Sequence, residues 1–367
     1  MLFNPIRAPQ PTTYAIDAAP TINVLNSMCG IAALPHNPGI DDFLARTAAS
    51  FTTEQHRLYT ASLGMFSLNA LLRLVDPLPP TVPAYIDHLE TTDAVWLRDR
   101  ILQTLNIVNA LKIHTDDEQI PAPDTARILT DKAYYLAYLS QFAMFDDFDP
   151  AIFDLTHHLL THPADLKRQI IDMLRWLWDD HFVAEWERVK PTVQASVTAL
   201  QRIPTADLAP FDAIHAVTGR NLYGILRAEA VNAFSHIRFI PSTHNGPYIT
   251  SLALDDTLII VFGARLPQQS NTGTSLDHAE LLNQLKAIGD ETRLDILIML
   301  HQHGEMGTAQ IMDRFDLNKS AASRHLRNLR AAELIDERRD EDGKGKFYTL
   351  NAAGVNTLLD TLRALLG

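Results

Sequence analysis

A basic segment near the end of the chain, from Leu317 to Arg339, carries the residues best suited to bind a partner. Asn318 is a suitable N-cap for a helix over this segment. At 3.6 residues per turn, Ala322, Leu326 and Leu329 fall on one apolar face. The rest of the surface presents short polar groups and cations near the helix N-terminus, which suits the base edges and phosphates of DNA. The predicted DNA contacts on this helix are Lys319, Ser320, Ala321, Ser323, Arg324, His325 and Arg327.

A second basic element follows the helix. The sequence LIDERRDEDGKGKFYTL predicts a β-hairpin with Gly343 and Gly345 at its tip. Cations on such a hairpin can contact phosphates or the minor groove beside a helix that lies in the major groove. The predicted contacts here are Arg338, Arg339, Lys344 and Lys346.

The basic helix also has a simpler interpretation, as an ordinary amphipathic helix with a solvated charged face. The order of the surrounding elements, the N-cap and the hairpin favour DNA binding over that interpretation. His325 remains open between two roles, because it can contact DNA or pack at the edge of the apolar face.

The overall acidity of the chain does not exclude a DNA partner. The formal net charge is −13. Residues Leu276–Gly367 carry 12 Lys+Arg and 15 Asp+Glu, so most of the net negative charge precedes them. Nine basic residues lie between Arg314 and Lys346. DNA responds to the local field of the docking face, which salt screens over about 8 to 10 Å, more than to net charge.

The segment RWLWDDHFVAEWE, from Arg175 to Glu187, combines aromatic and acidic residues. Their helical spacing favours packing in a core. The alternative is an aromatic pocket with nearby carboxylates that binds a small molecule, with a cation as the suited ligand. The predicted ligand contacts in that alternative are Trp178, Phe182, Glu185 and Trp186.

Other candidate chemistry is sparse, and we expect no enzyme activity, metal or cofactor. His158 and His162 have a spacing that can bind a metal, but no third ligand motif accompanies them and chance pairing is the better explanation. The single cysteine, Cys29, excludes an intrachain disulfide, and its apolar setting favours a buried inert thiol over a redox switch. No nucleophile elbow, P-loop or dinucleotide fingerprint occurs.

The elements predicted to hold these residues are mainly helical. Helices are expected from about Pro20 to Ile203, with Pro191 as a kink or break in a long helix that starts at Pro163. Short strands are expected at 12–17, 236–242, 247–256 and 257–265, which gives a small β-sheet. We predict a helical N-terminal domain over 1–266, a linker over 267–275, and a C-terminal winged helix-turn-helix domain over 276–367.

The C-terminal segment resembles the winged helix-turn-helix of ArsR-type transcriptional regulators. The resemblance rests on LKAIGDETRLDILIML, on the spacing of Ser320, Ser323 and His325 before two leucines, and on GKFYTL. It implies a dimer formed through the first and last helices of the module, and repression of a promoter. Gly307 and Ala309 stand where many relatives have metal-binding cysteines, so that metal chemistry is not carried over. The N-terminal part is similar to an uncharacterised helical domain that precedes some such modules.

These observations together predict a cytoplasmic, homodimeric, sequence-specific DNA-binding regulator. We expect it to act as a repressor on double-stranded DNA, while the N-terminal domain senses a small-molecule effector, adds dimer contacts, or does both. The start of the sequence has no apolar export segment and no run is long enough to span a bilayer, so no membrane partner is expected. The alternative is a small-molecule-binding protein or enzyme whose C-terminal module is a protein-interaction scaffold. A structural DNA-binding protein without sensing is a third interpretation.

Overall fold

The computed structural model describes residues 12–34, 40–64, 66, 68–104, 123–141, 149–220, 222, 226–264, 278–339 and 345–366. The chain divides into two compact units. Unit 1 comprises Met1–Leu34, Asp41–Asn245 and Ile249–Leu266. Unit 2 comprises Pro35–Ile40, Gly246–Tyr248 and Pro267–Gly367. The linker predicted over 267–275 lies outside the described residues, so the domain boundary there stays a prediction.

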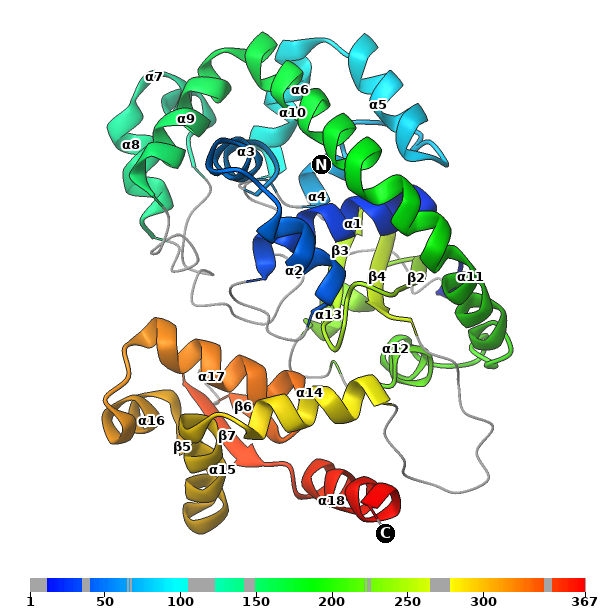
Figure 1. Ribbon diagram of the computed structural model, residues 1–367, viewed down its shortest axis with the longest axis vertical. Coiled ribbons are helices and arrows are strands. Elements are labelled where there is room, and N and C mark those ends of the chain that lie inside the picture. The colour runs from blue at the N-terminus through cyan, green and yellow to red at the C-terminus, as the bar shows by residue number, and fades with distance from the viewer. Residues whose placement is uncertain are drawn as a thin grey trace. The chain divides into compact units, whose positions relative to one another are not determined.

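Helices make up most of unit 1, as Figure 1 shows. They are α1 (Pro20–Ala33), α2 (Asp42–Ala49), α3 (Thr53–Tyr59), α4 (Leu68–Leu72), α5 (Val82–Thr91), α6 (Ala94–Thr104), α7 (Thr125–Thr130), α8 (Lys132–Leu139), α9 (Pro150–Thr161), α10 (Pro163–Leu177), α11 (Val183–Leu200), α12 (Pro210–Thr218) and α13 (Ala228–Val231). Proline occupies the first turn of α1, α9, α10 and α12, where its missing N–H group leaves no hydrogen bond unmade.

The long helix predicted from Pro163 is interrupted at a different place from the one expected. A π-helical turn, Trp178–Phe182, separates α10 from α11, whereas α11 continues through Pro191 without a break. A second π-helical turn, Thr60–Gly64, follows α3. Sequence periodicity cannot locate such turns because they add one residue to a turn without changing residue types.

The described strands of unit 1 form a sheet in the order β1-β2-β4-β3. The strands β1 (Thr13–Ile16), β2 (His236–Ser242) and β4 (Thr257–Gly263) are parallel neighbours. The strand β3 (Thr250–Leu254) pairs antiparallel with β4 through a tight turn at Asp255, whose φ is 51°. The predicted hairpin is therefore confirmed, although β3 begins three residues later than the expected strand.

Both faces of this sheet are covered, which explains the continuous apolar sequence of β4. Ile237 and Phe239 of β2, with alternate residues of β4, pack in a core with Phe211 and Ile214 of α12. The helix α1 also contacts β2, and Ile259 and Val261, which alternate with the core residues on β4, are buried as well. Residues from Leu258 to Phe262 are consequently all buried, as expected of a strand buried on both sides.

The first two helices described in unit 2 are α14 (His278–Ile288) and α15 (Glu291–His303). The short strand β5 (Met306–Gly307) then leads to the helices α16 (Thr308–Phe315) and α17 (Lys319–Ala331). The strands β6 (Ile335–Arg339) and β7 (Lys346–Leu350) and the helix α18 (Ala352–Leu366) follow. The strand order is β5-β7-β6, with antiparallel pairing throughout. This is a winged helix-turn-helix, so the predicted fold class is confirmed, and β5 is the element that the sequence did not reveal.

Local signals in the sequence account for the boundaries in unit 2. Gly304 ends α15 with a φ of 77°, a conformation that favours glycine. The Oδ1 atom of Asn318 accepts a hydrogen bond of 2.8 Å from the Ala321 N–H and caps α17. The core contains Ile296, Ile311 and Leu329, which join α15, α16 and α17. Across the described part of the chain, no helix has the length and apolar character needed to cross a membrane.

Candidate nucleic-acid interface

The helix α17 has one buried face and one charged face. Ala322, Leu326 and Leu329 are 0–2% exposed, so the predicted apolar face is confirmed. Lys319, Arg324 and Arg327 are exposed, while Ala321 and Ser323 are partly buried. Among the residues that the structure describes, Arg324 forms no ion pair. The side chain of Ser320 lies outside the described set.

His325 is the member of the predicted contact set that faces inward. It is 8% exposed, and its Nδ1 atom lies 3.5 Å from Oδ1 of Asp290. Burial lowers its pKa, the carboxylate of Asp290 opposes that shift, and the cations Arg293 and Arg324 add to it. This placement favours packing at the edge of the core over a contact with DNA.

The strands β6 and β7, which together form the wing, carry cations that are already paired. Arg338 donates two hydrogen bonds to Glu305, and Lys346 lies 3.9 Å from Oε1 of Glu337. The side chain of Arg339 and the whole of Lys344 lie outside the described residues, as does Gly343 at the expected tip. Sequence reasoning missed the two glutamates because their partners come from other elements of unit 2.

The aromatic segment of unit 1 is mostly buried. Phe182 and Trp186 are 1% and 8% exposed, and Trp178 is half-buried. Glu185 is 6% exposed and faces His244 rather than solvent. The four residues predicted to bind a ligand therefore lie in the π-helical turn Trp178–Phe182 and in the first turn of α11. Three of them, Phe182, Glu185 and Trp186, are buried against other residues of the protein.

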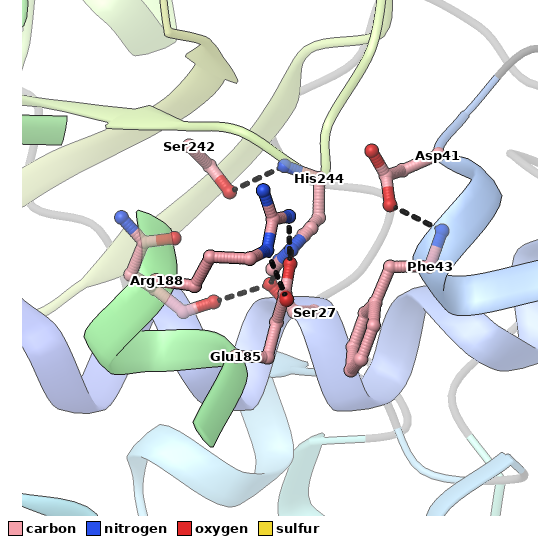
Figure 2. A network of polar contacts seen from close by, with 8 residues as sticks. Ser27, Asp41, Phe43, Glu185, Arg188, Ser242 and His244 are labelled. Atoms are coloured by element: carbon pink, nitrogen blue, oxygen red, sulfur yellow. Dashed lines mark hydrogen bonds and ion pairs between the residues drawn. The ribbon is translucent and has the colours of Figure 1, made fainter. Parts of the chain in front are cut away.

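Figure 2 shows the buried polar network around Glu185. Its Oε1 atom lies 2.8 Å from Nε2 of His244, and Arg188 donates two further hydrogen bonds to the same carboxylate. Nδ1 of His244 lies 2.9 Å from the Ser27 hydroxyl, and the Phe43 ring stacks on the imidazole with 5.3 Å between centroids. Burial alone would raise the pKa of Glu185, but hydrogen bonds from Arg188 and His244 outweigh it and lower the pKa.

The chain of hydroxyl, imidazole and carboxylate invites comparison with a hydrolytic triad, but its surroundings oppose that role. Ser27 is 1% exposed in the middle of α1. Its hydroxyl donates to the backbone carbonyl of Asn23, 2.9 Å away and one turn earlier. A nucleophile must be accessible to a substrate and must be able to give its proton to a base. The Ser27 hydroxyl is buried, and it donates its hydrogen bond to a backbone carbonyl instead. The network joins α1, α11 and the residues after β2 as a packed unit.

The remaining candidates in unit 1 carry no assembled site. The rings of His158 and His162 stack at 4.1 Å, and Nδ1 of His162 lies 2.9 Å from the His158 carbonyl oxygen. No group of three or more potential metal ligands occurs among the described residues. Cys29 is partly exposed as a residue, but burial of its thiol raises the pKa to about 12, which favours the inert-thiol interpretation.

Comparison with known proteins agrees with the geometry of unit 2. The family model described as bacterial regulatory protein, arsR family, matches residues 290–337. The transcriptional activator HlyU of Vibrio cholerae is 36% identical over 81 residues, which cover 22% of this chain and 72% of HlyU. The transcriptional repressor SdpR of Bacillus subtilis is 41% identical over 71 residues, which cover 19% of this chain and 73% of SdpR.

A third relative, the arsenical resistance operon repressor of Staphylococcus aureus, is 29% identical over 90 residues, which cover 24% of this chain and 84% of the repressor. No solved structure matches the chain. The matched family segment runs from the N-cap of α15 to the middle of β6 and so contains the whole of α17. Through this winged helix-turn-helix, the chain belongs to the arsR family of bacterial regulatory proteins.

Proposed function

We propose that the protein is a sequence-specific DNA-binding transcriptional regulator that represses transcription by occluding a promoter. The observation that carries this proposal is the charged face of α17, where Lys319, Arg324 and Arg327 are exposed opposite a fully buried face. Arginine and lysine in this position can bind guanine edges or phosphates in the major groove. Of the three relatives described above, two are named as repressors and one as an activator. The names of the two repressors support repression in this proposal.

The active species in this proposal is a homodimer on a pseudo-palindromic site. The helix α17 of each copy, which we call the recognition helix, then enters one of two successive major grooves about 34 Å apart. Exposed leucines on α18 support an apolar contact between copies: Leu359 is 43% exposed and Leu365 is 63% exposed. The family resemblance predicts the same helix as a dimer element.

Unit 1 acts in this proposal as a sensor of a small molecule or as a further dimer contact. This role is supported by the observation that unit 1 is a large compact unit with its own sheet and hydrophobic core. An effector that binds unit 1 would change DNA affinity only if it favours one of two arrangements of the dimer, typically by 1–3 kcal/mol. The competing function is a small-molecule-binding protein or enzyme whose unit 2 is a protein-interaction scaffold.

The test is enrichment of genomic DNA fragments on the purified full chain, followed by titration of the enriched fragment at two salt concentrations. The proposal expects a few inverted-repeat sites and an affinity that falls steeply as salt rises. Arg324→Ala and Lys319→Ala should each weaken binding, by roughly 5- to 100-fold for a residue that reads a base.

The matched control is Arg168→Ala in α10, which removes an equally charged and well-exposed side chain from unit 1. It should leave DNA binding unchanged. Binding that ignores salt, or that all three variants affect equally, would contradict the proposal and favour the scaffold function. A ligand-independent DNA affinity would leave the regulator intact but remove the sensing role of unit 1.

A further inference from the structure

The wing of unit 2 places an arginine and a glutamate across a strand from each other. In the sheet order β5-β7-β6, Phe347 of β7 pairs with Gly307 on one side and with Arg338 on the other. Glu305 immediately precedes β5 and accepts hydrogen bonds from Arg338, whose guanidinium lies over the Phe347 ring. Arg338 therefore reaches Glu305 by crossing over the central strand.

This crossing holds the guanidinium group between a carboxylate at its edge and an aromatic ring at its face. Nε of Arg338 donates to Oε1 of Glu305 at 2.7 Å, and Nη2 donates to Oε2 at 2.6 Å. The guanidinium carbon lies 5.0 Å from the centroid of the Phe347 ring, as in a cation–π contact. Hydrogen bonds from Arg338 lower the pKa of Glu305, so the carboxylate is ionised at neutral pH.

The other face of the wing also carries a paired carboxylate. Glu337, the neighbour of Arg338 on β6, accepts a hydrogen bond of 2.6 Å from Arg330 of α17. Its other oxygen lies 3.9 Å from Nζ of Lys346. Glu337 is 9% exposed, so this carboxylate is held in the fold, whereas Arg338 and Glu305 remain 58% and 35% exposed.

An arginine offers the same two-pronged donor edge to a carboxylate and to a phosphate. Arg338 already gives that edge to Glu305, and the pair has no net charge. A cation in this state does not neutralise a phosphate and releases no counterion from DNA. The exposed cation Arg324, in contrast, meets no carboxylate among the described residues.

We propose that Glu305 restrains DNA affinity by holding Arg338 away from phosphates, so that the wing arginine does not count among the cations that neutralise DNA. This inference rests on the proposed DNA-binding function and deepens it, because it separates the cations that drive binding from one that is balanced internally. The effect is to weaken sequence-independent binding, which depends on phosphate neutralisation, more than base reading on α17.

The experiment measures the affinity of the full chain for a labelled duplex of scrambled sequence and about 30 base pairs over a series of salt concentrations. This length accommodates two recognition helices about 34 Å apart. Glu305→Gln should free Arg338, raise affinity about tenfold per wing near 0.1 M salt, and steepen the salt slope by about 0.9 per wing. The double variant Glu305→Gln/Arg338→Gln keeps the net charge of the wild type and should restore the wild-type slope.

The matched control is Glu54→Gln in α3, which breaks a bidentate arginine pair with Arg57 in unit 1 and changes net charge equally. It should leave affinity and slope unchanged. The inference is overturned if Glu305→Gln leaves the slope at its wild-type value. It is equally overturned if the double variant flattens the slope by about 0.9 per wing, because Arg338 then contacts phosphate in the wild type.

The double variant also keeps the test decisive if Glu305→Gln disturbs the wing, since it removes both charges together and circular dichroism checks its folding. The two proposals fail differently. Wild-type binding that shows no salt dependence and ignores Arg324→Ala would remove the DNA-binding function itself. Salt-steep binding that Arg324→Ala weakens and Glu305→Gln does not alter would overturn the role of Glu305 alone.

Discussion

The Nδ1 atom of His325, in the middle of the recognition helix α17, lies 3.5 Å from Oδ1 of Asp290, the residue that caps α15. The same Asp290 oxygen accepts a 2.9 Å hydrogen bond from the Arg293 N–H. Arg293 in turn donates to the backbone carbonyls of Ala287 and Lys286 at the end of α14. Asp290 and Arg293 together thus link α14, α15 and α17 and help to fix the position of α17.

Asp290→Ala should lower the free energy of unfolding of unit 2 by about 1 kcal/mol, because the first turn of α15 loses its capping acceptor. This loss is measured by unfolding the full chain in urea and monitoring unit 2 through hydrogen exchange of the α15 amides. Asp290→Asn keeps a capping oxygen and should remain close to the wild type. Equal losses in both variants would show that the charge of Asp290, rather than its cap, stabilises the helix.

His325 should titrate below its ordinary pKa of about 6.5, because burial disfavours the charged ring. Between the lowered pKa and 6.5 the unfolded chain binds more protons than the folded chain, so stability falls as pH drops through this window. An NMR titration of the imidazole, assigned by its loss in His325→Gln, measures the shift directly. A midpoint at or above 6.5 would contradict the buried placement.

Glu185→Ala should destabilise unit 1 by about 1–3 kcal/mol, because it leaves the buried His244 ring without its hydrogen-bond partner. The matched control is Glu187→Ala, two residues along α11, whose pair with Lys190 is exposed. That variant should change stability by less than about 0.5 kcal/mol. Thermal unfolding followed by near-ultraviolet circular dichroism compares them, and equal effects would show that the network contributes little.

The same carboxylate predicts how acid acts on unit 1. The pKa of Glu185 is lowered in the fold, so its contribution is present above the unfolded pKa of about 4.3 and is lost as pH falls through the folded pKa. The difference in stability between wild type and Glu185→Ala should therefore shrink below about pH 4. A difference that stays constant to pH 3 would argue against an ionised Glu185.

Cys29 should resist alkylation in the folded chain. With its pKa raised to about 12 by burial, the thiolate fraction at pH 8 is about one in ten thousand. Because Cys29 is the single cysteine of the chain, a colorimetric thiol assay reports on it alone. Slow labelling in buffer and complete labelling in urea are expected, whereas rapid stoichiometric labelling of the native chain would reopen the redox interpretation.

The sequence by itself determined the elements whose signals are local. The cap at Asn318 and the apolar spacing of Ala322 and Leu326 predicted the start of α17 and the face of this helix that is buried. The strands β2 and β4 could also be predicted from the sequence, because their runs of apolar residues are short and end at turn residues. Each of these features depends on residues within a few positions of one another.

Only the tertiary structure decided which charged side chains meet. Arg338 and Glu305 are 33 positions apart, and Glu185 and His244 are 59 apart. Their contacts depend on the register of β6 and β7 and on the packing of α11 against the sheet, neither of which leaves a periodic pattern in the sequence. The local sequence pattern could therefore identify Arg338 as a candidate DNA contact and Glu185 as a candidate ligand contact. The fold assigned each of them a partner within the protein.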